Sequence, residues 1–289
     1  MQVRSIARRK MSSGRATVGT EGDRALAEWN SRFLGTIDPT RERRREAILC
    51  ALGTPARPPV RVLDLGTGPG PLAERILRQF PGSQVVGVDF DPVRLRVAEV
   101  AMAPNGSRVD WVRADIRRED WSAELPTGRF DAVVSSLALH WLEKGELRRL
   151  FRDLHQLLRP GGLLVNGDFL PSERTEPARR PRKSAEVGKR PAENNGAKLS
   201  DFKQRWKRWW EALVRQRDMV PYFEARQNHM PGAIPPRRTS GPRAPASVEF
   251  HLRALRAARF RDTAVAWREN GFPVLVGTNG ASSASQAER

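Results

Sequence analysis

The stretch VLDLGTGPGPLAERIL, residues 62–77, decides how the rest of the chain is interpreted. A short apolar run of the kind that forms a buried parallel strand leads into three closely spaced glycines, and a helical pattern follows at once. The loop itself reads GTGPGP over residues 66–71. Glycines let the backbone approach a ligand closely, so we interpret this loop as a binding site.

The loop differs from the two common nucleotide-binding loops. A phosphate-binding P-loop needs Lys-Ser/Thr after its last glycine, and none follows here. A dinucleotide loop has the pattern G-x-G-x-x-G, and Pro71 stands where its third glycine belongs. Asp64, on the strand before the loop, is unfavourable beside a pyrophosphate but suits a ligand with an ammonium group. The loop therefore favours a cationic ligand over either phosphate.

Two further acids follow neighbouring strands. Asp89 is the next-to-last residue of the segment QVVGVDF, and an acid about 20 residues after such a loop accepts hydrogen bonds from ribose hydroxyls. Phe90 beside it can lie on an adenine ring. Asp115 in WVRADIRRE can accept from an adenine amino group, with Ile116 against the ring. The structural alternatives are a strand-end turn for Asp89 and a helix cap for Asp115, whereas Asp91 is expected to cap the next helix.

Strands and helices alternate through this part of the chain, which predicts a parallel sheet covered on both faces. Near the end, the segments DTAVAWRE and FPVLVGT are joined by Asn-Gly, the strongest short hairpin signal. The fold class is therefore α/β, with a mostly parallel sheet that ends in an antiparallel hairpin. The expected strands cover residues 60–66, 84–90, 109–115, 130–139, 163–170, 262–269 and 272–278, and the expected helices residues 71–80, 91–102, 144–158 and 247–260.

Composition divides the chain into a core and several additions. A helix at residues 200–216 carries Phe202, Trp206, Trp209, Trp210 and Leu213 on one stripe, which fits either packing on the sheet or a lid over a substrate pocket. The expected units are a disordered basic leader (1–22), an N-terminal helical cap (23–55), the core (56–170), a disordered basic insertion (171–199), the Trp-rich lid helix with a Pro-rich linker (200–246), and a C-terminal helix and hairpin with a disordered tail (247–289).

The net charge of +18 lies outside the core. Residues 57–171 hold 16 Lys and Arg against 15 Asp and Glu, so the segment with the glycine loop is nearly neutral. The excess is mostly arginine, as a GC-rich genome produces without selection for a polyanion. We interpret the basic residues mainly as solvated surface. A nucleic acid stays a possible partner because the segments outside the core are basic.

Other sequence features limit the compartment. No run of about 18 apolar residues exists, so no membrane span is expected. The single cysteine, Cys50, excludes an internal disulfide and a Cys-rich metal site, and it is expected in the core; no metal ion is expected. The basic leader without an apolar segment fits a cytoplasmic bacterial protein better than an organellar transit peptide.

Five segments together carry a resemblance to a known family: VLDLGTGPG, VVGVDFDP, VRADIRR, FDAVVSSLALHWL and LLRPGGLLVNGDF. Over roughly residues 56–170, and more loosely in the terminal hairpin, the chain resembles the class I S-adenosylmethionine-dependent methyltransferases. The resemblance implies a Rossmann-like, doubly wound sheet of seven strands and S-adenosyl-L-methionine as cofactor. It also implies that Asp64 and the glycines face the methionine portion, Asp89 the ribose and Asp115 the adenine. The cofactor-binding residues expected are Asp64, Gly66, Thr67, Gly68, Gly70, Asp89, Phe90, Asp115, Ile116 and Ser135.

Methyl transfer needs a base when the acceptor must lose a proton during attack. His140 follows the fourth strand and Asp168 ends the fifth, so both are candidate catalytic residues. The alternatives are that His140 orders its loop and that Asp168 is a turn residue. The oligomeric state and the acceptor stay open, and aromatic residues in the additions favour a small acceptor. Two further hypotheses are an RNA-modifying (tRNA) or carboxy-S-adenosylmethionine-type enzyme, and a cofactor-binding protein without transferase activity.

Overall fold

The first strand, β1 (Arg61–Leu65), is buried on both faces and lies in the middle of the sheet. The computed structural model describes residues 39–53, 58–173, 204, 207–228, 245–269 and 271–280. The strands of these residues form one seven-stranded sheet in the order β3-β2-β1-β4-β5-β7-β6. The others are β2 (Gln84–Asp89), β3 (Val109–Arg113), β4 (Phe130–Ser136), β5 (Leu158–Gly167), β6 (Phe260–Glu269) and β7 (Phe272–Asn279).

The first five strands run parallel, and β7 runs antiparallel to both β5 and β6. The predicted C-terminal hairpin is therefore confirmed, with Gly271 at its turn in the left-handed conformation (φ +81°). Because β1 to β5 are parallel, their carboxyl ends lie along one edge of the sheet, where open α/β sheets bind ligands. The predicted fold class is confirmed.

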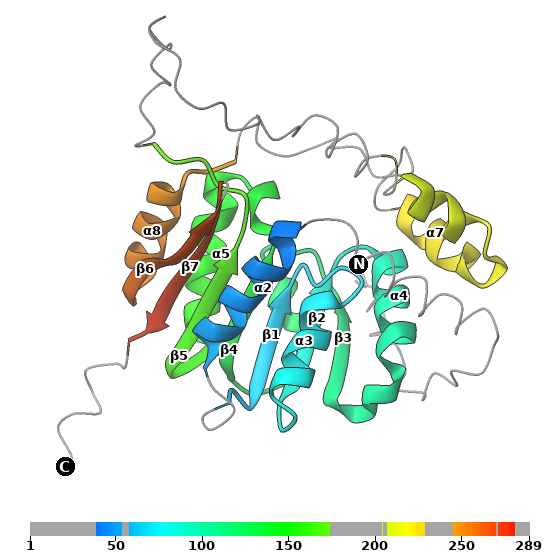
Figure 1. Ribbon diagram of the computed structural model, residues 1–289, viewed down its shortest axis with the longest axis horizontal. Helices are drawn as coiled ribbons and strands as arrows, with labels where there is room; N and C mark the ends of the chain where they lie inside the picture. Colours follow the sequence, from blue (N-terminus) through cyan, green and yellow to red (C-terminus); the bar gives the residue numbers. More distant parts are fainter. Residues whose placement is uncertain are drawn as a thin grey trace, which may run out of the picture.

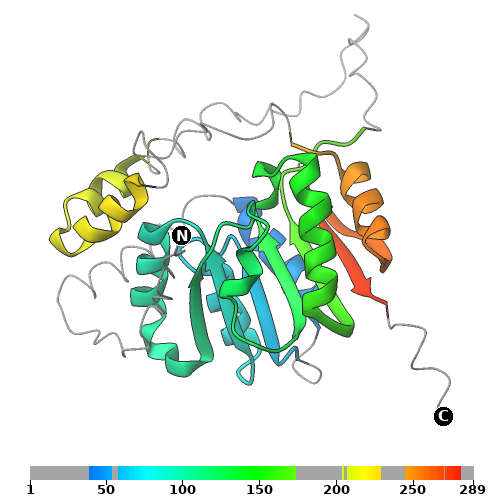
Figure 2. The ribbon, with the colours of Figure 1, turned by 180° about the vertical axis from the view of Figure 1, so that it is seen from behind.

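Helices cover both faces of the sheet (Figures 1 and 2). On one face α2 (Pro39–Leu52) and α3 (Pro71–Gln79) pack on strand side chains such as Val62 and Val134. On the other, α5 (Lys144–Leu157) and α8 (Val248–Ala257) pack on Leu63 and Leu164. Further helices of the described residues are α4 (Pro92–Met102) and α7 (Val220–Gln227), and short 3-10 turns are η1 (Ala103–Arg108), η2 (Trp121–Glu124), η3 (Leu139–Trp141) and η4 (Arg217–Met219).

The Trp-rich helix packs against α4 and not on the sheet, so the simpler of the two sequence interpretations was wrong. Residues 207–214 are helical, and together with α7 they lie beside α4 (Figure 1). The apolar stripe on the helix at residues 207–214 predicted that one face of this helix is buried. That face is covered by α4. The shared cluster consists of Val93, Val97, Val100, Trp209, Trp210, Leu213, Met219 and Phe223.

The chain leaves β5 and returns to α8 at almost the same point. Val248 N donates to the carbonyl oxygen of Pro171 at 2.9 Å, and Ser172 Oγ bonds Glu249 at 2.8 Å. Glu173 N donates to the other carboxylate oxygen of Glu249, also at 2.8 Å. We call these contacts between residues 171–173 and 248–249 the stem. The predicted leader, residues 23–38 and 54–55 of the predicted N-terminal cap, the insertion beyond residue 173 and the end of the tail lie outside the described residues.

Two smaller sequence expectations have outcomes here. Asp91 caps α4 as predicted, since its carboxylate accepts from Val93 N at 3.0 Å. Cys50 was expected in the core and is exposed, because Ile48, Leu49 and Leu52 carry the buried face of α2. No helix among the described residues is long and apolar enough to cross a membrane.

Candidate functional site

The glycine loop turns at the carboxyl end of β1 with three glycines at positive φ: Gly66 (+64°), Gly68 (+58°) and Gly70 (+81°). A Cβ at Gly66 would lie 2.3 Å from that of Ala138, so this position is filled by the protein itself. A Cβ at Gly70 would also meet protein, since Trp111 would lie at 3.1 Å. At Gly68 a Cβ would meet nothing within 4 Å. Gly68 is therefore the glycine of the loop that faces open space.

Asp64 lies buried beneath this loop. Its Oδ2 accepts from Thr67 Oγ1 at 2.7 Å, which ties the loop to the strand that precedes it. Burial raises the pKa of Asp64 to about 7, although the hydrogen bond from Thr67 acts in the opposite direction. An ammonium group near Asp64 would favour its ionised form.

Asp89 fixes the loop from the neighbouring strand. Its Oδ2 accepts from Gly68 N and its Oδ1 from Asp91 N, both at 2.9 Å. The backbone adds a further link, since Thr67 N donates to the carbonyl oxygen of Val88 at 3.0 Å. Burial raises the pKa of Asp89. Each carboxylate oxygen still has a free lone pair, so Asp89 can accept further hydrogen bonds from a ligand.

Asp115 already has a partner in the structure. Both of its oxygens accept from the Arg117 guanidinium, with Nη2 at 2.7 Å and Nε at 2.9 and 3.1 Å. Although burial opposes the effect, the hydrogen bonds from Arg117 lower the pKa of Asp115. Arg117 also lies 5.5 Å above the centre of the Phe90 ring. An adenine amino group can reach Asp115 only when Arg117 releases one of these bonds.

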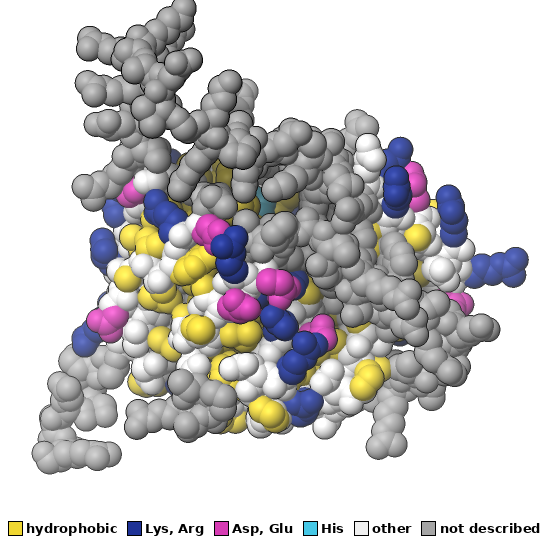
Figure 3. All heavy atoms as spheres, in the orientation of Figure 1, with side chains coloured by type: hydrophobic (Ala, Val, Ile, Leu, Met, Phe, Trp, Pro, Cys, Tyr) yellow, Lys and Arg dark blue, Asp and Glu magenta, His cyan; other side chains and the backbone are white. Residues whose placement is uncertain are grey.

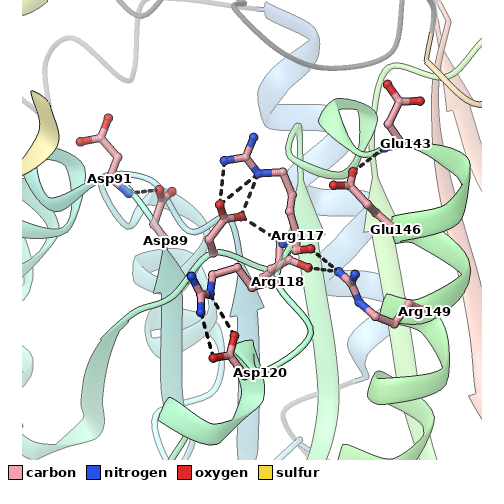
Figure 4. A network of polar contacts seen from close by, with 10 residues as sticks. Asp89, Asp91, Arg117, Arg118, Asp120, Glu143, Glu146 and Arg149 are labelled. Atoms are coloured by element: carbon pink, nitrogen blue, oxygen red, sulfur yellow. Dashed lines mark hydrogen bonds and ion pairs between the residues drawn. The ribbon is translucent and has the colours of Figure 1, made fainter. Parts of the chain in front are cut away.

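A side chain from α5 supports the turn that carries Arg117. Arg149 Nη2 donates to the carbonyl oxygens of Ile116 at 3.1 Å and Arg117 at 2.7 Å (Figure 4). Ile116 is half-buried and packs against the core on this face of the sheet. Ser135 is buried on β4 and donates its hydroxyl to the carbonyl oxygen of Leu65 at 3.0 Å. Its hydroxyl therefore connects β4 to β1.

His140 and Asp168 form a dyad at the ends of β4 and β5. His140 Nδ1 lies 2.6 Å from Asp168 Oδ1, and His140 N donates to Asp168 Oδ2 at 2.9 Å. Asp168 is fully buried, and its Oδ1 also accepts from Phe169 N at 2.8 Å. The carboxylate thus assigns the proton of the imidazole to Nδ1 and leaves Nε2 as a hydrogen-bond acceptor. His140 can therefore serve both predicted roles at once: its backbone N and Nδ1 order the loop through Asp168, and its Nε2 stays available to act as a base.

The order of the strands places the sequence-predicted residues in a row along one edge of the sheet. Following the sheet from β3 to β5, the edge carries Asp115, Asp89, the glycine loop, His140 and Asp168. No group of three or more His, Cys, Asp or Glu that could hold a metal ion occurs among the residues that the structure describes.

Sequence reasoning missed three side chains at this edge. Trp141 follows His140, Phe169 follows Asp168, and Arg226 of α7 pairs with Asp91. The two aromatic residues could have been noted, because each directly follows a candidate catalytic residue. Nothing local in the sequence links residues 91 and 226.

Comparisons with known proteins agree with this architecture. Residues 62–162 match the family described as "Methyltransferase domain". A demethylmenaquinone methyltransferase of Thermus thermophilus is 35% identical over 128 residues, which are 44% of this chain and 54% of the relative. A methyltransferase of Mycobacterium tuberculosis is 42% identical over 109 residues, 38% of this chain and 50% of the relative. The chain thus spans about half the length of these relatives.

Among solved structures, an O-methyltransferase family protein from Burkholderia thailandensis superposes with a TM-score of 0.53. The sequence identity is 17%, and the alignment covers 90% of this chain and 59% of the other. At this identity the superposition concerns the fold, and it confirms the arrangement expected from the sequence.

Proposed function

We propose that this chain, whose residues 62–162 match a methyltransferase-domain family, is a class I S-adenosylmethionine-dependent methyltransferase that transfers a methyl group from S-adenosylmethionine to a small-molecule acceptor. The observation that carries the proposal is the row of groups along the carboxyl edge of the sheet. It combines an open glycine, Gly68, with a buried carboxylate on either side of it, Asp64 and Asp89.

These groups fit the chemistry of S-adenosylmethionine from end to end. Burial raises the pKa of Asp64 to about 7, and the ammonium group of the amino-acid portion would stabilise the ionised form of its carboxyl group. Asp89 has free lone pairs for the two ribose hydroxyls. Phe90 and Ile116 supply apolar surface for the adenine, and Asp115 accepts from its amino group after Arg117 gives way. Gly66, Thr67, Gly70 and Ser135 shape the site from within the protein.

When bound, the sulfonium of the cofactor supplies an activated methyl group, so the residues of the chain mainly position and desolvate the reactants. His140 Nε2 is the base for an acceptor that loses a proton during attack. Asp168 holds the imidazole in the tautomer that this task needs, and it stabilises the imidazolium that results. His140 follows β4, the strand next to β1 and its glycine loop, and Asp168 follows β5, one strand further along the sheet.

A small acceptor is favoured over a nucleic acid by the charge of this edge. Asp64, Asp89, Asp115 and Asp168 all lie along it, and carboxylates disfavour a polyanion. On the face shown in Figure 3, the described basic and acidic side chains are interspersed over the left and centre, and several basic side chains gather at the right. Arg75 and Arg45, for example, both pair with Glu42.

The test is calorimetric titration of the whole chain with S-adenosylmethionine and S-adenosylhomocysteine. We expect both to bind, and Asp89→Ala to weaken both by at least about tenfold because charged hydrogen bonds are lost. Asp131→Ala is the matched control, since Asp131 bonds backbone N–H groups of residues 60 and 61 at the opposite end of the strands. Absence of binding to the unaltered chain would refute the proposal, and unchanged affinity in Asp89→Ala would refute the ribose assignment.

A further inference from the structure

Two exposed aromatic side chains flank the His140–Asp168 dyad. Among the described residues, six large hydrophobic side chains are exposed, and two of them are aromatic: Trp141 at 41% and Phe169 at 47%. Both lie at the carboxyl edge of the sheet, whereas the other four are valines elsewhere. Exposed aromatic rings beside a site with a candidate base mark a surface on which a ligand can lie.

The backbone brings the two rings to the same carboxylate. Asp168 Oδ1 accepts both from His140 Nδ1 at 2.6 Å and from Phe169 N at 2.8 Å. Trp141 is the next residue after His140, and its ring centre lies 5.1 Å from that of the imidazole. Each aromatic residue is therefore the immediate sequence neighbour of one member of the dyad: Trp141 of His140, and Phe169 of Asp168.

Both rings are held in place by neighbours. Phe169 packs against Phe272 at the start of β7, with ring centres 5.3 Å apart. Phe272 is in turn covered by Arg44 of α2, whose guanidinium carbon lies 5.0 Å from the ring centre. Trp141 lies against the imidazole, as described above. A ring fixed before binding loses little conformational entropy when a ligand covers it, which strengthens binding.

The carboxylate of Asp168 and the imidazole of His140 favour some classes of acceptor over others. The carboxylate of Asp168 is fully buried and in contact with the imidazole, so an acceptor that carries a carboxylate of its own would be disfavoured here. An imidazole takes a proton far more readily from an O–H group with a pKa near 10, as in a phenol, than from an aliphatic alcohol. The ring surfaces favour a flat, conjugated molecule for the same reason that aromatic rings stack on one another.

We infer that the acceptor is a neutral, planar, conjugated hydroxyl compound of the phenol or enol class, bound on Trp141 and Phe169 with its O–H at His140 Nε2. This inference rests on the proposed function. The acceptor O–H bond breaks and its proton passes to His140 Nε2, while an oxygen lone pair forms the new O–CH₃ bond. The electrons of the broken C–S bond stay on sulfur, which leaves as a neutral thioether.

The experiment compares three probes of similar size by calorimetry: α-naphthol, α-naphthoic acid and decahydro-α-naphthol. Each is titrated into the full chain with and without saturating S-adenosylhomocysteine. We expect α-naphthol to bind at least about threefold more tightly than either of the others, the size of an aromatic stacking contribution. Trp141→Ala and Phe169→Ala should each weaken α-naphthol about 3- to 10-fold.

Conservative variants and a remote control separate stacking from damage to the fold. Trp141→Phe and Phe169→Tyr keep a ring and should retain most of the affinity, and Val265→Ala, on the exposed edge strand β6, should retain all of it. Equal binding of the saturated alcohol or of the acid would overturn the inference, as would unchanged affinity in both alanine variants. If S-adenosylhomocysteine does not bind, the proposed function fails at the first addition, and the three probes still test the surface in the free protein.

Discussion

Arg226 of α7 and Asp91 at the start of α4 form a buried ion pair across 135 residues of sequence, with Nε 3.1 Å from Oδ2 and both side chains at most 2% exposed. The guanidinium also lies 5.1 Å from the centre of the Trp210 ring. Asp91 N donates to Asp89, so the pair joins the helices at residues 207–227 to the carboxylate assigned to the ribose.

Replacement of Arg226 by Met should destabilise the protein by up to about 3–5 kcal/mol, because the buried charge of Asp91 then keeps only the longer ion pair with Arg94, at 3.7 Å. Urea unfolding measures the free energy directly. Arg118→Ala breaks a fully exposed ion pair with Asp120 and should leave the free energy of unfolding unchanged within error. Equal stability of Arg226→Met and the unaltered chain would show that the ion pair does not anchor these helices.

Asp64 should make the protein less stable as the pH rises. Its folded pKa of about 7 lies above the ordinary value of 3.8, so the folded state holds this proton more tightly than the unfolded state. The stabilisation is complete below about pH 4 and is lost as the pH rises to about 7, at about 1.4 kcal/mol for each pKa unit.

The measurement is the free energy of unfolding at pH 5 and pH 8 for the unaltered chain and for Asp64→Asn. The difference between the two proteins should move in favour of Asp64→Asn as the pH rises through this interval. A difference that stays constant between the two pH values would show that Asp64 ionises with an ordinary pKa.

Gly66 and Gly68 should respond differently to alanine. Both have positive φ, so each substitution costs about 1–2 kcal/mol from the backbone alone. Gly66→Ala adds a clash with Ala138 and should lower the melting temperature much further. Gly68→Ala places its methyl group in open space, and its main effect should be weaker binding of S-adenosylhomocysteine.

Thermal unfolding and calorimetry on the two variants separate these effects. Retained cofactor affinity in a folded Gly68→Ala variant would mean that the ligand does not approach the loop at this glycine.

His140→Gln should lower kcat by about 10²- to 10⁴-fold with a phenolic acceptor, since the base is lost. The affinity for S-adenosylhomocysteine should change little, because the carboxylates assigned to the cofactor, Asp64, Asp89 and Asp115, lie on or directly after β1, β2 and β3. His155→Gln serves as the control, because His155 lies on α5 against Phe260. A kcat close to that of the unaltered enzyme would leave His140 with only its loop-ordering role.

The sequence predicted the sheet because its signals are local. Short apolar runs, glycine breaks and the Asn-Gly turn each act over a few residues, and a parallel sheet then brings the strand ends together. That is why Asp64, Asp89 and Asp115 could be placed at one edge before their partners were known. The resemblance to a family added the number of strands.

Long-range packing accounts for what the sequence did not reveal. The stripe with Trp209 and Trp210 indicates a buried face, but the same stripe fits a sheet, a pocket or another helix. In the same way, the residue type at position 117 did not show that its guanidinium would bind Asp115 and cover Phe90. Cys50 in α2 is a further example, because the residue type alone predicted a buried thiol. The buried face of the helix is formed by neighbouring residues, and the thiol is exposed.

The stem at residues 171–173 and 248–249 separates the connection between β5 and α8 from the strands that carry the acidic residues of the site. Because the chain leaves and re-enters the domain at one point, the connection on either side of the helices at residues 207–227 can be lengthened or shortened without a change in the direction of β5 or α8, while the ion pair between Arg226 and Asp91 holds those helices to α4. Selection can therefore alter that connection while the strands that carry Asp64, Asp89 and Asp115 stay constant. One cofactor-binding scaffold can in this way be combined with many different acceptor specificities through recombination at a single junction.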